Sequence, residues 1–238
     1  HEAANRRLKI IFDYFDYVYV SFSGGKDSGI LLHLCMDYIR MHAPGRKLGV
    51  FHMDYEVQYR QSTENVERMF SNNRDILEVF HCCVPFKVPT CTSMYQQYWR
   101  PWQEGYQNIW VRQMPGTALT VKDFDFWNDS LWDYDFQSLF PSWIRRKKGC
   151  KRVCCLVGIR TQESFNRWRA IHSDKNYRKL ANYKWTHRVG YYTYNAYPIY
   201  DWKTTDVWTG YARYGWDYNR LYDLYYQAGI PLSRQRVT

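Results

Sequence analysis

The feature that most constrains the fold is a short glycine-rich segment between a predicted strand and a predicted helix. Residues 17–22 are β-branched and aromatic, which is typical of a strand. Ser-Gly-Gly-Lys-Asp-Ser follows at 23–28. From Asp27 to Met41 apolar residues recur at the spacing of a helix. A glycine turn that joins a buried strand directly to a helix indicates an α/β sheet with this loop at a helix N-terminus.

Further elements extend this pattern along the chain. Strand, helix and strand recur in alternation, which predicts a parallel sheet with right-handed crossovers. We therefore predict an α/β fold with a doubly wound, mainly parallel sheet. The later predicted strands lie at 48–53, 76–81 and 153–158, and the later predicted helices at 61–71, 204–214 and 218–228.

The stretch from 84 to 150 departs from the pattern. Prolines and tryptophans punctuate it, and it is too aromatic to be a flexible linker. We expect an aromatic-rich insertion, irregular or built of short helices, that packs over one edge of the sheet. The whole chain, 1–238, is then a single domain that carries 84–150 as an insertion.

Composition limits the compartment and the partners. No stretch approaches the roughly 18 apolar residues of a spanning helix, so we expect no membrane partner. The sequence does not open with an apolar leader. Four of its seven cysteines form two pairs of sequence neighbours. Both observations favour a reduced, cytoplasmic protein. The net charge of +10 is compatible with an anionic partner and equally with a basic solvated surface.

The residue types in segment 23–28 are suited to phosphate. Its glycines allow an anion to approach the backbone, and the helix N-terminus offers free N–H groups. Lys26 adds a positive charge, and Ser23 and Ser28 add hydroxyl groups. Asp27 is placed to help hold a metal ion that is carried by the phosphates. The spacing is not that of a Walker A loop.

This segment resembles the loop of the PP-loop (pyrophosphatase-loop) superfamily, which carries Ser-Gly-Gly-x-Asp-Ser after its first strand. The resemblance implies a fold of the adenine nucleotide α-hydrolase type and a nucleotide held by its phosphates. In members that use ATP, the α-phosphorus is attacked and pyrophosphate leaves. The expected ligands are therefore a nucleotide, ATP or phosphoadenosine phosphosulfate (PAPS), with Mg²⁺.

Other segments resemble the PAPS reductase-like branch of that superfamily. They are His-Met-Asp at 52–54 with 61–64, Gly-Ile-Arg at 158–160 with Glu163 and Arg167, and the segments 197–208 and 221–229. The middle of the chain, around 83–85 and 99–115, resembles an uncharacterised subfamily found in phage or prophage contexts beside ParB-like partners. The resemblance implies such a partner and does not supply a reaction.

Arg160 is the strongest candidate for a catalytic or nucleotide-binding residue outside the loop. It directly follows a predicted strand end, where ligands bind in open α/β sheets, and Arg167 would share its face if both lay on one helix. A set of surface ion pairs is the alternative. We predict that the catalytic residues are Lys26, Asp27 and Arg160. The predicted nucleotide-binding residues are Ser23, Gly24, Gly25, Lys26, Asp27, Ser28, Asp54, Gly158, Arg160, Glu163 and Arg167.

Cysteine spacing argues against the redox chemistry of the family. The chain lacks a cysteine after Cys155 and lacks a Cys-x-x-Cys pair, so we expect no iron–sulfur cluster. Two interpretations of Cys154 and Cys155 are open: ligands in a metal site with other cysteines, or small buried residues of a strand. The latter is favoured because their surroundings are apolar.

The basic run 145–152 leaves two interpretations open, a nucleic-acid contact or a solvated loop.

The sequence supports three functions. The first is pyrophosphate-releasing adenylylation with ATP. The second is processing of PAPS or adenylyl sulfate, and the third is a regulator that senses a nucleotide without turning it over and acts with a ParB-like or DNA partner.

Overall fold

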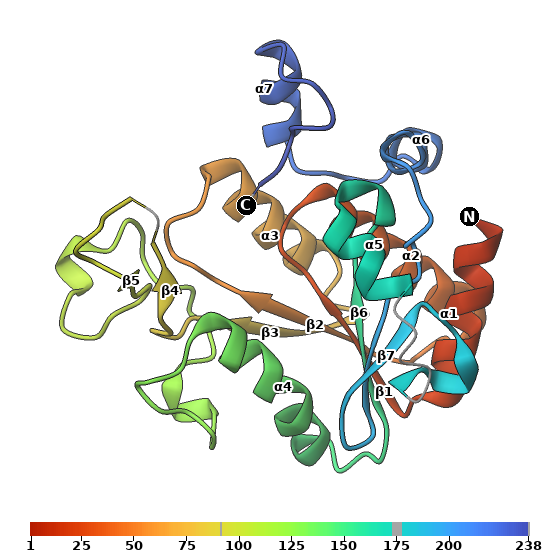
Figure 1. The fold of residues 1–238 in the computed structure, drawn as a ribbon, viewed down its shortest axis with the longest axis horizontal. Helices are drawn as coiled ribbons and strands as arrows, with labels where there is room; N and C mark the ends of the chain where they lie inside the picture. The colour runs from red at the N-terminus through yellow and green to blue at the C-terminus, as the bar shows by residue number, and fades with distance from the viewer. Residues whose placement is uncertain (91, 173–177, 238) are drawn as a thin grey trace.

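The structure is a computed structural model that describes residues 1–90, 92–172 and 178–237. Its centre is a six-stranded sheet with the order β3-β2-β1-β6-β8-β7 (Figure 1). Neighbouring strands are parallel except for β7 and β8, which form an antiparallel edge. The strands are β1 (Tyr17–Ser21), β2 (Leu48–Met53), β3 (Leu77–Cys82), β6 (Val153–Val157), β7 (Thr186–Gly190) and β8 (Thr193–Ala196).

Helices connect these strands, and a small two-stranded ribbon lies apart from the sheet (Figure 1). The α-helices are α1 (Glu2–Tyr14), α2 (Lys26–His42), α3 (Arg60–Asn72), α4 (Asp133–Lys147), α5 (Phe165–His172), α6 (Thr204–Tyr214) and α7 (Leu221–Gln227). The ribbon and the short 3₁₀ turns are β4 (Val88–Pro89), β5 (Tyr98–Trp99), η1 (Gln107–Ile109), η2 (Val121–Asp123), η3 (Thr161–Glu163) and η5 (Leu180–Asn182).

The strand order reverses beside β1. Val20 of β1 is in register with Val50 of β2 on one side and with Leu156 of β6 on the other. The chain first runs outward from β1 through β2 to β3 and then returns to build the other half from β6. The loops that follow β1 and β6 therefore diverge and leave a crevice at the carboxyl edge of the sheet. The doubly wound, mainly parallel sheet that the sequence predicts is confirmed.

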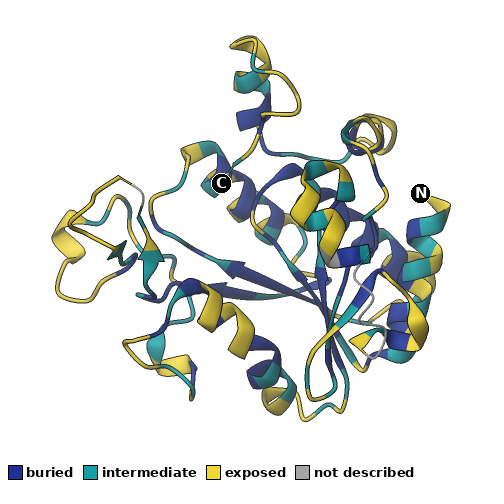
Figure 2. Cartoon of the chain, in the orientation of Figure 1, coloured by how far each residue is buried: buried dark blue, intermediate teal, exposed yellow. Residues whose placement is uncertain are grey.

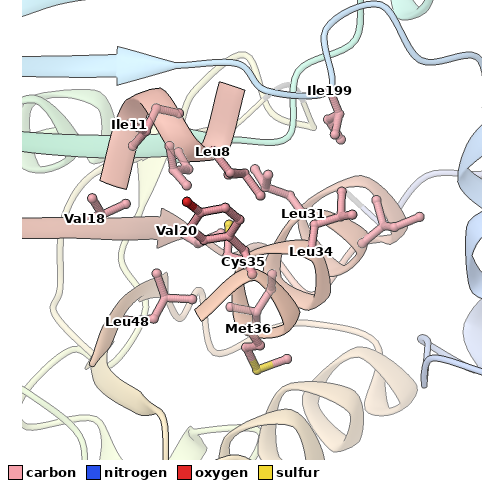
Figure 3. Packing of buried hydrophobic residues seen from close by; sticks show 14 of the residues in the cluster. Leu8, Ile11, Val18, Val20, Leu31, Leu34, Cys35, Met36, Leu48 and Ile199 are labelled. Atoms are coloured by element: carbon pink, nitrogen blue, oxygen red, sulfur yellow. The ribbon is translucent and has the colours of Figure 1, made fainter. Parts of the chain in front are cut away.

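Each face of the sheet buries its own hydrophobic cluster because side chains alternate along a strand. On one face, Val18 and Val20 pack against α1, α2 and α6, with Leu8, Ile11, Leu31 and Leu34 around them (Figure 3). On the other face, Tyr19 and Phe51 pack against α4. Figure 2 shows the central strands buried and the outer helix surfaces exposed.

The expected insertion at 84–150 ends in a long helix. Its irregular part reaches only to Trp132, and α4 then covers the sheet face opposite α2 and α3 (Figure 1). Phe136, Phe140 and Trp143 of α4 recur at helical spacing and reach the second cluster. The prolines that suggested irregularity include Pro141, which α4 accommodates.

Several elements of the fold were not predicted, α5 and the β4–β5 ribbon among them. Helix α1 precedes the first strand, and the β7–β8 hairpin completes the sheet edge. The hairpin depends on packing against the rest of the sheet, whereas α1 carries a local signal of its own, because its buried residues Ala4, Leu8, Ile11 and Phe12 recur at helical spacing. Within the described part of the chain, none of the helices has the length and apolar character needed to cross a membrane.

Replacing Phe140 with alanine tests the second cluster. Phe140 is fully buried, and its ring centroid lies 4.1 Å from that of Phe51. We expect Phe140→Ala to lower the free energy of unfolding by about 3–5 kcal/mol, measured by chemical denaturation. Leu139→Ala is the matched control, because Leu139 is exposed on the same helix. Equal losses for the two variants would contradict the packing of α4 described here.

Candidate functional site

The loop between β1 and α2 closes on itself through its two serines. The backbone N–H of Ser23 donates to Ser28 Oγ at 3.2 Å, and that hydroxyl donates to the Gly25 carbonyl at 3.2 Å. Gly24 has a φ of +79°, a left-handed conformation that favours glycine. Helix α2 begins directly afterwards at Lys26. The six residues therefore form one compact turn at a helix N-terminus.

Polar side chains from distant parts of the chain fix this turn. The Gly24 carbonyl accepts from Asn65 Nδ2 at 3.2 Å and from Asn219 Nδ2 at 3.0 Å. The Lys26 backbone N–H donates to the Tyr222 hydroxyl at 3.0 Å, and the Tyr211 hydroxyl donates to the Lys26 carbonyl at 2.7 Å. Sequence reasoning missed these four residues, because most of them lie almost 200 positions from the loop.

Gly158 lets the end of β6 pass against the first turn of α2. A Cβ at this position would lie 2.8 Å from the backbone C and O atoms of Asp27 and from the backbone N of Ser28. Backbone atoms cannot move aside as a flexible side chain can. The structure thus brings Gly158 to the loop, as the sequence predicts, and only glycine fits there.

Arg160 reaches the loop from the same strand end and is buried, at 1% exposure. Its Nε donates to Asp27 Oδ1 at 2.6 Å, and its Nη1 donates to the Trp202 carbonyl at 3.4 Å and to Thr204 Oγ1 at 3.2 Å. Lys26 Nζ lies 3.1 Å from Asp27 Oδ2. The donors of the Arg160 guanidinium are therefore already bonded to protein groups. Arg160 contacts the loop through Asp27.

Glu163 links Arg160 to Arg167. Its carboxylate lies 3.8 Å from Arg160 Nη2 and also pairs with Arg167. The expectation that the two arginines share the face of one helix is wrong, because Ser164 is extended and separates η3 from α5. They converge instead on one carboxylate. Burial lowers the pKa of Arg167, and the positive charge of Arg236 lowers it further.

The segment 235–237 covers the loop. Lys26 Nζ donates to the Gln235 carbonyl at 3.3 Å, and Arg236 Nη2 donates to the Glu163 carbonyl at 3.4 Å. A Cβ on Gly25 would lie 2.9 Å from Val237. Burial lowers the pKa of the Lys26 ammonium, and Asp27 opposes that change. Arg236 was not among the predicted residues, and its sequence context offers no motif that would have indicated it.

Two adjoining cavities open at this edge of the sheet. One, of about 170 Å³, is lined by Lys26, Asp27, Glu163, Arg167 and Arg236 among others. The second, of about 860 Å³, shares Ser21, Ser23, Arg167 and Val237 with it. Its remaining lining is largely aromatic and includes Phe51, Tyr55, Tyr59, Trp99 and Tyr134. A small charged space therefore leads into a larger aromatic one.

Asp54 is buried at the end of β2, and its bonding partners are not residues of the loop. Its Oδ2 lies 2.7 Å from His81 Nε2, and its Oδ1 accepts from the Glu56 backbone N–H at 2.8 Å and from Arg112. The Trp102 indole N–H donates to its backbone carbonyl at 2.9 Å. Asp54 is not among the described residues that line the two cavities. The structure therefore does not bring its carboxylate together with the loop.

Glu56 is a second anchor for this segment that sequence reasoning missed. Its φ is +62°, and its carboxylate accepts from the backbone N–H of Trp102 at 2.7 Å and of Val111 at 3.0 Å. Together Asp54 and Glu56 attach segment 102–112 to the end of β2.

Cys154 and Cys155 cannot ligate one metal ion together, because they point to opposite faces of β6. Cys154 belongs to the first hydrophobic cluster and Cys155 to the second. Burial raises the pKa of both thiols. Their position supports the interpretation that they are small buried residues of the core.

The loop residues fit a Mg²⁺ ion that arrives with phosphates. Mg²⁺ is usually held by one or two carboxylates together with substrate phosphates and water. Asp27 and Glu163 supply two carboxylates on the small cavity, and Ser23 and Ser28 supply hydroxyl oxygens there. Both carboxylates already pair with cations, so this set suits a shared ion rather than a cage built of protein ligands alone.

Gly158→Ala tests the close approach of β6 to α2. The added methyl group would meet backbone atoms at 2.8 Å, and we expect it to lower the free energy of unfolding by about 1–3 kcal/mol. Gly116→Ala is the control, because a Cβ at Gly116 meets no atom within 4 Å. Thermal and chemical unfolding measure both. A Gly158→Ala variant as stable as the Gly116→Ala variant would contradict the geometry.

Comparison with known proteins adds to this description. Residues 124–228 match the family model of the phosphoadenosine phosphosulfate reductase domain. The chain is 36% identical over 239 residues to "Uncharacterized protein YbdN" of Escherichia coli (strain K12), with 99% of this chain aligned, and it spans 57% of that relative's length.

Solved structures show the fold. The FMN adenylyltransferase of Candida glabrata, in complex with FAD and inorganic pyrophosphate, aligns with a TM-score of 0.52 at 15% identity, covering 93% of this chain and 59% of that one. The PAPS reductase of Candida auris, in a phosphate complex, aligns with a TM-score of 0.47 at 14% identity, covering 93% of this chain and 84% of that one. Residues 124–228 are thus similar to the phosphoadenosine phosphosulfate reductase domain, and the chain has the α/β fold that the adenylyltransferase also has.

Proposed function

We propose that this protein binds ATP at the loop 23–28 and catalyses a reaction at the α-phosphate that releases pyrophosphate. The observation that carries the proposal is the convergence of Lys26, Arg167 and Arg236 on the small cavity at the start of α2. Three cations face two carboxylates there, at a helix N-terminus, which favours a ligand with several negative charges. The product would be an adenylylated acceptor or AMP.

The phosphates are held by the loop backbone and by these cations. A phosphate oxygen takes the place of the Gln235 carbonyl as the acceptor for Lys26 Nζ. Arg167 and Arg236 then provide planar donors suited to two phosphate oxygens each. Asp27 and Glu163 would hold Mg²⁺, which supplies neutralising charge to the departing pyrophosphate. Such preorganised charge lowers the barrier without reorganisation during the reaction.

Arg160 is assigned a positioning role. Its guanidinium bonds Asp27, Trp202 and Thr204, which fixes the Asp27 carboxylate relative to Lys26. Gly158 permits the approach that makes this contact. We therefore propose that Arg160 acts on the phosphates through Asp27, and that Asp54 contributes to nucleotide binding by anchoring segment 102–112.

The aromatic cavity is proposed to take the adenine and the acceptor. Its volume of about 860 Å³ is within the range of small-molecule sites. Tyr55, Tyr59, Trp99 and Tyr134 offer ring faces on which a base can stack. Because Trp99 and Tyr134 come from the stretch 84–150, we propose that this insertion forms one wall of the site within a single domain of residues 1–238.

Partners beyond the nucleotide are proposals from the sequence. The basic run 145–152 offers Arg145, Lys147 and Lys151, whose cations lie 4.5–5.5 Å from aromatic ring centroids. Its other members pair with Asp16, Glu78 and Asp125. This surface remains a candidate contact for nucleic acid, and a ParB-like protein remains a candidate partner. The described cysteines are free, which supports a cytoplasmic location.

Two alternatives use the same pocket. PAPS or adenylyl sulfate would place a sulfonate among the same cations. A nucleotide-sensing regulator would bind ATP without turnover, and the retained loop supports binding in either case. Radiolabelled ATP distinguishes them: release of AMP and pyrophosphate supports the enzyme, release of ADP and phosphate contradicts attack at the α-phosphate, and binding without products supports the regulator. Absence of an iron–sulfur cluster stays a prediction, to be tested by iron analysis of anaerobically purified protein.

Lys26→Ala tests nucleotide binding. Removal of the ammonium deletes a charged hydrogen bond, so ATP affinity should fall by more than about 1 kcal/mol in calorimetry. Lys9→Ala is the control, because Lys9 is an exposed residue of α1 that pairs with Asp13. Equal ATP affinities for parent and Lys26→Ala protein would refute the assignment of the loop.

Arg160→Lys tests the positioning role once turnover is measurable. Lysine keeps the charge but cannot bond Asp27, Trp202 and Thr204 together. We expect kcat to fall by a factor that corresponds to ~2 kcal/mol or more, while KM for ATP changes little. A variant with normal kcat and only a lower melting temperature would show that Arg160 is purely structural.

A further inference from the structure

A buried cluster of two histidines and an aspartate lies outside the lining of the two cavities of the proposed site. His52 of β2 and His81 of β3 are register partners on adjacent parallel strands, and Asp54 follows His52 by two residues. All three side chains are buried. One ligand atom from each lies within 4.8 Å of the others. Side chains from two strand ends therefore converge on one point.

We propose that His52, Asp54 and His81 bind one divalent transition-metal ion, with Zn²⁺ as the best match. Two imidazole nitrogens and one carboxylate oxygen form a donor set that Zn²⁺ uses in proteins. The hard cations Mg²⁺ and Ca²⁺ prefer sites made of oxygen atoms alone. The proposal concerns a site separate from the nucleotide loop and does not depend on the proposed function.

The groups around the cluster already orient the ligands. His52 Nδ1 lies 2.7 Å from the Phe22 carbonyl, which can only accept, so Nδ1 carries the proton and Nε2 carries the lone pair. A backbone carbonyl on the second ring nitrogen is the usual support of a metal-bound histidine. On Asp54, the Glu56 N–H and Arg112 bond Oδ1, which leaves Oδ2 directed at His81.

The charge balance of this region favours a cation. Asp54 and Glu56 are buried carboxylates, and Arg112 is the cation that bonds Asp54. Two buried carboxylates thus share one arginine in a low-dielectric environment. A metal ion on Asp54 Oδ2 would leave Arg112 in place, because Arg112 bonds the other oxygen. The ion would lie between Oδ2 and His81 Nε2, which are 2.7 Å apart, and the proton of that hydrogen bond would move to His81 Nδ1 so that Nε2 offers its lone pair.

The ligand atoms need only a small adjustment. Bonds of about 2.0–2.1 Å in a tetrahedron place ligand atoms roughly 3.4 Å apart. The most separated pair would therefore close by roughly 1.4 Å, a distance that rotations of the side chains can supply. His81 also lines an open cavity of about 970 Å³ together with Glu64 and Glu67. Arg68 and Arg74 line the same cavity, which provides an entry path to His81.

A metal ion here would join three parts of the fold. It would tie the end of β2 to the end of β3 and, through Arg112 and Trp102, stabilise segment 102–112. We therefore expect the bound ion to raise the melting temperature, because it binds the folded chain only.

The test uses the full chain after treatment with a chelator. Titration with Zn²⁺ in a calorimeter is expected to give one equivalent per chain and a higher melting temperature. His81→Gln and Asp54→Asn should each lower the affinity by about tenfold or more. His33→Asn is the matched control, because His33 is also buried and its ring also bonds a backbone carbonyl, that of Asp217, at 2.8 Å. It should bind Zn²⁺ as the parent does.

The spectrum of Co²⁺ bound to the parent protein distinguishes this site from a thiol site. This measurement does not depend on the folding of a variant. Bound Co²⁺ should give visible d–d bands without a thiolate charge-transfer band. Cys83 is a buried thiol beside Asp54, and Cys83→Ser should leave the spectrum unchanged. Failure of the parent to bind one equivalent of Zn²⁺ would overturn the proposal. So would a thiolate band that is lost in Cys83→Ser, or an unchanged affinity in folded His81→Gln and Asp54→Asn.

Discussion

The buried ion pair between Arg160 and Asp27 is the interaction on which the site depends. It joins the two strand ends at the point where the strand order reverses, with Nε and Oδ1 2.6 Å apart. A buried guanidinium is tolerated only when its other donors are also satisfied, and the Trp202 carbonyl and Thr204 hydroxyl do this. The pair therefore draws the start of α6 towards the loop. Removing Asp27 would leave the buried guanidinium without its nearest carboxylate, whereas Asp27 keeps Lys26 as a partner when Arg160 is removed.

Around this pair the fold gathers more positive than negative charge. Lys26, Arg167 and Arg236 come from three separate segments and meet beside Asp27 and Glu163. Burial lowers the pKa of the Lys26 ammonium, and repulsion from Arg160 and Arg236 lowers it further, while Asp27 opposes the change. Backbone carbonyls of Gln235 and Glu163 offset part of that repulsion. A polyphosphate would offset it more completely, and this is the physical basis for expecting an anionic ligand here.

The carboxyl end of β2, at the same edge of the sheet as the loop, serves another purpose. Asp54 and Glu56 use buried carboxylates to hold Arg112, Trp102 and Val111, so an irregular segment acquires a fixed position. Irregular chain lacks the repeated backbone bonds of a helix or sheet, and charged anchors replace them. These contacts explain why Asp54, an acidic residue at a strand end that the sequence predicted to bind nucleotide, does not contact the loop.

The sequence by itself determined the elements whose signals are local. The alternation of strands and helices and the loop 23–28 follow from periodicity and turn chemistry within short windows, and these predicted the doubly wound sheet. Gly158 was indicated by the resemblance of its segment to the PAPS reductase-like branch. Tertiary structure decided which side chains meet. Arg236, Tyr222 and Asn219 reach the loop because the carboxyl end of the chain folds over it, and His81 meets Asp54 because β2 and β3 pair in one register. Contacts between residues far apart in sequence depend on how the elements pack, and no single segment encodes that packing.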